Sequence, residues 1–95
     1  RAPLGGFSRL VPELDVLDLD VSKAFWCDVL GFGIAYARPE SRFVFIEREG
    51  AQVMLKQQNG RWQTGALERP LGRGLNFQIF VGSVEPLLEA LRGAA

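Results

Sequence analysis

The chain has 95 residues, and its 11 basic and 11 acidic side chains cancel, so it suits one domain and has no overall field that would attract nucleic acid. A lone cysteine, Cys27, excludes an internal disulfide, and the lack of histidine excludes His-dependent catalytic triads and His metal sites. No apolar run approaches membrane-spanning length and the start, RAPLGGFSRL, lacks the apolar centre of a signal peptide, so we expect a cytoplasmic protein without a membrane partner.

The first elements in the chain are a strand and a short helix. Residues 10–17, LVPELDVL, alternate as a strand does. Asp18 or Asp20 is expected to cap the following helix, because a carboxylate accepts hydrogen bonds from the free N–H groups of a first turn. Gly31 is expected to end it in a left-handed conformation. The apolar stripe predicted to pack on the sheet comprises Val21, Ala24, Phe25, Val29 and Leu30.

Three strands are expected next, followed by a loop, a fifth strand and a last helix. Glu49-Gly50 is a plausible two-residue hairpin turn between the third and fourth strands. Asn59, Gly60, Gly65, Pro70 and Gly72 mark the long loop. Ser83 is expected to cap the last helix, with Pro86 in its first turn. The predicted strands are residues 32–37, 42–48, 51–57 and 74–81, and the last helix is 84–92.

The hairpin turn assigns side chains to the two faces of the sheet, because it places Ile46 opposite Val53 and Phe45 opposite Met54. One face is wholly aliphatic and should receive the helix. We call it the aliphatic face, and it comprises Val44, Ile46, Val53 and Leu55. The opposite face, which we call the mixed face, comprises Phe43, Phe45, Glu47, Gln52, Met54 and Lys56.

The same alternation orients the first and fifth strands. Side chains expected on the helix side are Leu10, Leu14, Val16, Leu75, Phe77, Ile79 and Val81. Those expected on the side of the mixed face are Val11, Glu13, Asp15, Asn76, Gln78 and Phe80.

The mixed face combines aromatic side chains and a methionine with a few polar groups, which is typical of ligand clefts. A dimer interface and a solvated sheet face are the alternatives. Its acids, Glu13, Asp15 and Glu47, with Lys56 as the only base, would suit a cationic and partly aromatic ligand. Trp62, in the long loop, would either stack on a planar ligand or cover the sheet edge.

Three segments resemble the vicinal oxygen chelate superfamily, and within it the glyoxalase/bleomycin-resistance group. They are VLDLDVSKAFWCDVLGF, RFVFIEREGAQVML and RPLGRGLNFQIFV, and the resemblance covers residues 10–92. It implies one α+β domain over residues 1–95. A βαβββ module, about 10–58, is followed by an incomplete second βα module, about 73–93. The sheet would be mixed and curved, with helices on one face.

The resemblance also implies where a metal would bind in the enzymes of this superfamily. It aligns their first-strand ligand with Val11, another with Asn76, and the fourth-strand carboxylate with Gln52, Val53 or Met54. Valine cannot bind a metal and asparagine is a poor ligand for transition metals. We therefore expect no metal, no cofactor and no catalytic residue.

The function that these observations favour is metal-free binding of a small molecule. The resemblance implies sequestration of a bleomycin-type glycopeptide antibiotic or a related ligand in a dimeric cleft. An enzyme of glyoxalase or dioxygenase type and a degenerate interaction module are the alternatives. The predicted ligand-binding residues are Glu13, Phe45, Glu47, Met54, Trp62, Asn76 and Gln78.

A homodimer is expected because one module leaves its mixed face half covered. Phe43, Phe45, Met54 and Phe80 together would form an apolar patch that monomers rarely expose. A symmetric contact that includes the fifth strand would cover it.

Overall fold

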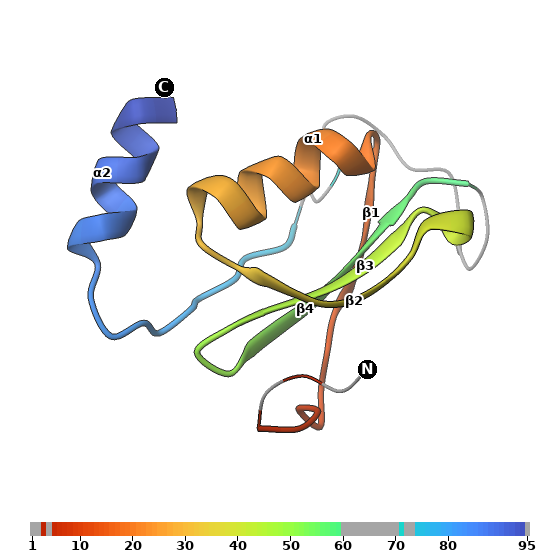
Figure 1. Ribbon diagram of the computed structural model, residues 1–95, viewed down its shortest axis with the longest axis horizontal. Coiled ribbons are helices and arrows are strands. Elements are labelled where there is room, and N and C mark those ends of the chain that lie inside the picture. The colour runs from red at the N-terminus through yellow and green to blue at the C-terminus, as the bar shows by residue number, and fades with distance from the viewer. Residues whose placement is uncertain (1–2, 4, 60–70, 72–73, 95) are drawn as a thin grey trace.

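The computed structural model describes residues 3, 5–59, 71 and 74–94. A single mixed sheet has the strand order β1-β4-β3-β2, with β1 parallel to β4 and the other neighbours antiparallel. Figure 1 shows α1 and η1 over one face of this sheet and the chain before β1 on the other side. The predicted α+β fold with a βαβββ module is confirmed. The elements are β1 (Glu13–Val16), α1 (Leu19–Ala24), the π-helical η1 (Phe25–Val29), β2 (Gly33–Arg38), the 3-10 helix η2 (Pro39–Ser41), β3 (Phe43–Arg48), β4 (Ala51–Gln57) and α2 (Glu85–Ala94).

Both ends of the first helix follow the prediction. Asp18 is the cap, and its Oδ1 accepts hydrogen bonds from the backbone N–H groups of Asp20 at 3.0 Å and Val21 at 3.4 Å. Gly31 has φ +78°, and a Cβ at this position would collide with Nη1 of Arg48. Glycine is therefore required here both for its left-handed backbone and for the close approach of Arg48.

The hairpin between β3 and β4 also has the predicted turn and register. Glu49 and Gly50 have φ values of 48° and 88°, as a two-residue type I′ turn requires. Phe45 pairs with Met54 and Ile46 with Val53, so the division into an aliphatic and a mixed face is correct. The core on the aliphatic side comprises Leu19, Phe32, Val44, Ile46, Val53 and Leu55.

The helix packs on this core with a different side from the predicted one. Val21 and Phe25 are exposed, so the predicted stripe is wrong at these positions, whereas its last member, Leu30, packs on the core as predicted. Leu19 is buried, and Trp26 and Cys27 pack against the same core from the following turn. The spacing of Leu19, Trp26 and Leu30 is also helical, so two apolar stripes competed and the sheet selected the one that carries Trp26. Desolvation, with the charge of Asp28 as a smaller cause, raises the pKa of the Cys27 thiol.

The start of the first predicted strand is wrong. β1 begins only at Glu13, and Leu10 is 85% exposed rather than inward. Leu14 and Val16 pack on the core as predicted. The alternation of apolar and polar residues therefore begins earlier in the sequence than the pairing of β1 with β4, which starts at Glu13.

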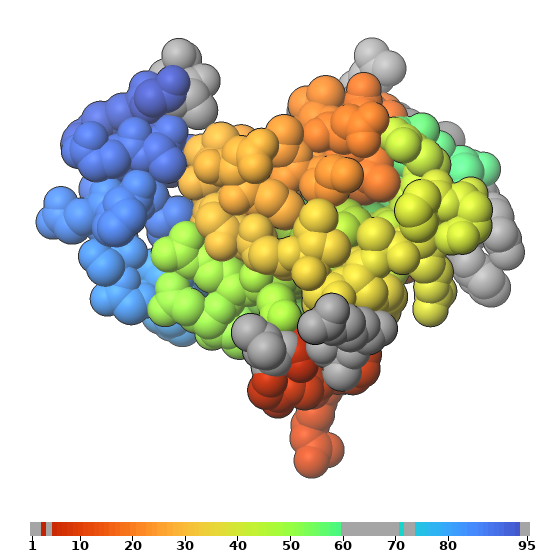
Figure 2. All heavy atoms as spheres, in the orientation of Figure 1, coloured from red at the N-terminus to blue at the C-terminus, as the bar shows by residue number. Residues whose placement is uncertain are grey.

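The fifth predicted strand is also wrong, because residues 74–81 are irregular and pair with no strand in the described part of the chain. Leu75 and Phe77 are exposed instead of facing the helix, whereas Ile79 packs on the core. Alternating apolar residues supply no backbone partner, and a strand needs one. The last helix does form, from Glu85, and it contacts η1, as Figure 2 shows where the blue and light-orange atoms meet.

Glu49 ties the chain before α2 to the hairpin. Its Oε1 accepts a 2.7 Å hydrogen bond from the backbone N–H of Gly82, and its Oε2 lies 3.1 Å from Nε of Arg48. Arg48 in turn donates from Nη1 to the carbonyl of Leu30 at 2.6 Å. These bonds join the hairpin to the end of η1 and to the segment that leads into α2.

This tie is expected to weaken in acid. The Gly82 N–H, with the Arg48 side chain as the next cause, lowers the pKa of Glu49 from its usual 4.5. A lowered pKa means that the tie is fully present above pH 4.5 and is lost as the pH falls through the lower, folded value. The NMR shift of the Gly82 amide should therefore titrate with a midpoint below 4.5, and Glu49→Gln should abolish the titration. A midpoint at or above 4.5 would contradict the contact.

Within the described ranges, none of the helices has the length and apolar character needed to cross a membrane.

Candidate functional site

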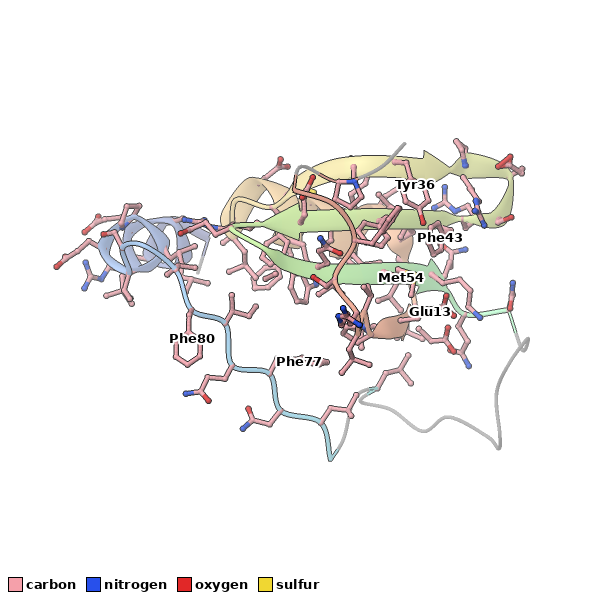
Figure 3. All side chains as sticks on the ribbon, turned by 90° about the horizontal axis from the view of Figure 1, so that it is seen from below. Glu13, Tyr36, Phe43, Met54, Phe77 and Phe80 are labelled. Carbon is pink, nitrogen blue, oxygen red and sulfur yellow. The ribbon has the colours of Figure 1, made fainter. Side chains whose placement is uncertain are left out.

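The mixed face is partly covered by the chain that precedes β1. Gln52, on β4, is only 7% exposed, and its side-chain amide holds this segment by two bonds. Nε2 donates to the carbonyl of Gly6 at 2.8 Å, and Oε1 accepts from the N–H of Ser8 at 2.8 Å. In Figure 3 this segment crosses in front of the sheet, on the face where Tyr36, Phe43 and Met54 are labelled.

Aromatic rings from three segments meet on the mixed face. Tyr36, on β2, stacks on Phe45 with centroids 5.1 Å apart and also contacts Phe43 at 5.9 Å. Phe7 meets Phe45 edge-on at 5.5 Å and Tyr36 at 6.5 Å. The guanidinium of Arg38 lies 5.5 Å from the Phe43 ring centre and 5.8 Å from that of Tyr36, within cation–π range. Such a cluster offers ring faces and edges to an aromatic ligand.

A buried cation lies beside this cluster. Lys56 is 7% exposed, and its Nζ lies 3.2 Å from Oδ1 of Asp15 and 4.0 Å from Oε2 of Glu13. The parallel pairing of β1 with β4 places all three on one side of the sheet, because Glu13 pairs with Met54 and Asp15 with Lys56. Two of the three acids expected to meet a cationic ligand, Glu13 and Asp15, thus already face an internal ammonium, and Glu13 is the more exposed of the two.

The predicted ligand-binding residues are not all brought together. Phe45, Glu47 and Met54 lie on the mixed face with Glu13 at its β1 edge, but Phe45 is only 2% exposed beneath Phe7 and Tyr36. Met54 and Glu47 are half-buried.

The remaining predicted residues lie elsewhere. Asn76 and Gln78 are exposed in the irregular segment 74–81, and not on a sheet strand. Figure 3 shows the neighbouring Phe77 and Phe80 on this segment, away from the strands. Trp62 lies outside the described residues.

The residues at the aligned metal positions do not fit a metal. Val11 has no donor atom, and Asn76 is not on the sheet. The amide of Gln52 is committed to Gly6 and Ser8, and Lys56 faces the nearest carboxylates. In residues 3, 5–59, 71 and 74–94, no three His, Cys, Asp or Glu side chains are grouped as metal ligands.

The alternation of residues in β2 does not predict that Tyr36 lies on the mixed face. Ile34 pairs with Ile46, so regular alternation would place Tyr36 opposite Val44. The register shifts between Ile34 and Tyr36, and Tyr36 pairs with Phe45 instead. Such an irregularity turns a side chain to the other face of the sheet, and no residue in the β2 sequence GIAYAR predicts it. The covering of the face by Phe7 was also missed, since the chain before residue 10 has no periodicity.

No protein-family model matches the chain, and no curated protein does. Among solved structures, it resembles an integron cassette protein from the mobile metagenome of the Halifax Harbour sewage outfall, with 23% identity and a TM-score of 0.58 over 93% of this chain and 72% of that one. A glyoxalase/bleomycin resistance protein/dioxygenase superfamily member from Vibrio splendidus is 41% identical, with a TM-score of 0.48 over 87% of this chain. The chain spans 65% of the length of the Vibrio protein.

A bleomycin-binding protein from bleomycin-producing Streptomyces verticillus, solved with copper(II)-bleomycin, is 25% identical with a TM-score of 0.47. That match covers 55% of this chain and 41% of the Streptomyces protein. The likeness to the integron cassette protein shows that the two chains share a fold.

Proposed function

We propose that the protein binds a small molecule on the mixed face without a metal, and sequesters a bleomycin-type glycopeptide or a related ligand without converting it. The observation that carries this proposal is the aromatic cluster of Tyr36, Phe43 and Phe45 beside a polar edge that includes Glu13. Aromatic walls with a few oriented polar groups suit a ligand site. The bleomycin class comes from the sequence resemblance of residues 16–32, 42–55 and 69–81.

Calorimetric titration with metal-free bleomycin tests this function, followed by chromatography of the recovered ligand. Saturable binding with the ligand recovered intact is expected. Consumption of the ligand would favour an enzyme, and the absence of heat would favour an interaction module. Glu13→Gln should weaken binding about two- to fivefold, because an exposed charge–charge contact contributes at most about 1 kcal/mol.

The first supporting prediction concerns metal content. Because the aligned positions lack ligands, protein purified from metal-supplemented cells is expected to hold no stoichiometric zinc, nickel or iron. Elemental analysis after gel filtration checks this. One equivalent of a transition metal per chain would contradict it, whereas a metal that enters inside a chelating ligand would not.

The second concerns assembly. We propose a homodimer whose interface includes residues 74–81, because Leu75, Phe77 and Phe80 are exposed close together in sequence and a symmetric contact would cover them. Light scattering at micromolar concentration should give twice the chain mass. The change Phe80→Ser should shift this toward the monomer, and a stable wild-type monomer would contradict the proposal.

A further inference from the structure

We infer that the mixed face recognises an aromatic ring flanked by two amide groups, and that residues 6–8 occupy this site as an internal ligand. The inference rests on the proposed function, since it names the chemistry that the same face selects. It is carried by the contacts that this short segment makes, and by how little the segment gains from them.

The polar part of the site is the side-chain amide of Gln52. Its donor and its acceptor bind the two backbone groups on either side of Phe7, namely the carbonyl of Gly6 and the N–H of Ser8, each at 2.8 Å. A buried amide that lost both partners would be left unsatisfied. Gln52 therefore selects an occupant that offers a carbonyl and an N–H at the spacing found on either side of one residue.

The apolar part is the aromatic cluster beneath Phe7. The stack of Tyr36 on Phe45 is a fixed pair, since Phe45 is 2% exposed within the β3–β4 hairpin. The Phe7 ring adds only edge contacts to this pair and remains 58% exposed. A ring with more of its surface in contact with the pair would bury more apolar area than Phe7 does.

Residues 6–8 can leave without loss of the sheet. The next backbone bond along the chain runs from the N–H of Met54 to the carbonyl of Pro12 at 2.9 Å, directly before β1. The other contact of Ser8, from its Oγ to the carbonyl of Gly50, is long at 3.4 Å. A ligand that satisfies Gln52 and stacks on Tyr36 and Phe45 would thus compete with residues 6–8 alone.

The test uses the full chain and the peptide acetyl-Gly-Gly-Phe-Ser-amide, which carries the sequence of residues 5–8. Phe7→Ala removes the internal ring. Its apparent affinity for the peptide should be at least tenfold higher than that of wild type. The NMR shifts of the Gln52 side-chain amide measure this affinity. The double variant Phe7→Ala/Gln52→Met keeps the length of the Gln52 side chain but not its amide. Its affinity for the peptide should be at least tenfold lower than that of Phe7→Ala, as measured from the Met54 methyl signal. Leu10→Ala, which lies before β1 but outside residues 6–8 and their contacts, should bind the peptide with the affinity of wild type.

Equal peptide affinity in wild type and Phe7→Ala, or no peptide binding to either, would overturn the inference. The same proteins are titrated with metal-free bleomycin. If wild type binds bleomycin but Phe7→Ala does not change the affinity for the peptide, the inference is overturned and the proposed function still holds. Peptide binding that follows the expected order without bleomycin binding supports the inference and removes bleomycin as the ligand class. Faster hydrogen exchange at the Ser8 amide in Gln52→Met, with unchanged exchange at Ile46, supports release of the segment from a folded sheet.

Discussion

Leu55→Ala is expected to lower the free energy of unfolding by about 3 kcal/mol, within the range for buried leucines. Leu55 is 0% exposed at the centre of the aliphatic face, between β1 and β3, where Leu14 and Val44 pair with it. Strands on both sides hold the site open, so the cavity will collapse little. Urea denaturation followed by circular dichroism measures the loss. For a domain of this size the loss is a large part of the total stability.

The matched control is Leu10→Ala, the same chemical change at a side chain that is 85% exposed. It should alter the free energy of unfolding by no more than about 0.5 kcal/mol. Similar losses for the two variants would contradict both the burial of Leu55 and the start of β1 at Glu13.

Lys56→Met is expected to lower the free energy of unfolding by about 1–3 kcal/mol at neutral pH. Methionine fills a similar volume, but it leaves Asp15 and Glu13 facing each other without the ammonium, which lies 3.2 Å and 4.0 Å from their oxygens. The loss stays below that of a fully buried pair, because the side chains of Asp15 and Glu13 are 20% and 36% exposed.

The exposed ion pair in α2 provides the control for this charge effect. Nη1 of Arg92 lies 2.8 Å from Oε1 of Glu89, but both side chains are more than two-thirds exposed. Arg92→Met should therefore change stability by no more than about 0.5 kcal/mol. An equally small loss for Lys56→Met would show that Lys56 is not a buried counter-ion.

Local chemistry determined which parts of the fold were predictable. The Glu49-Gly50 turn fixed the register of β3 with β4, and that register divided the aliphatic from the mixed face. Asp18 and Gly31 fixed the helix ends for equally local reasons. In each case the residues that specify the feature are the residues that form it.

The predictions that failed depend on partners far away in the chain. Residues 74–81 alternate as a strand does, yet no described strand pairs with them. Two apolar stripes on the helix were possible, and only packing on the sheet chose Leu19 and Trp26 over Val21 and Phe25.

The candidate site was predictable to the same extent. Phe45 and Met54 were placed on the mixed face through the hairpin. The contributions of Tyr36 and Phe7 depend on a register shift and on a segment without periodicity. The polar role of Gln52 was missed because its partners are backbone groups of that same segment.

We propose that the mixed face is the ligand site, and the methyl signal of Met54 is the most direct test of it. It is the single methionine of the sequence, and Figure 3 shows it on this face. A sample labelled at the methionine methyl group is titrated with metal-free bleomycin, and Met54→Leu assigns the signal. A ligand on the mixed face should shift the Met54 methyl resonance saturably, with the same affinity as in the calorimetric titration. Calorimetric binding that leaves this resonance unmoved would place the ligand elsewhere and contradict a ligand site on the mixed face.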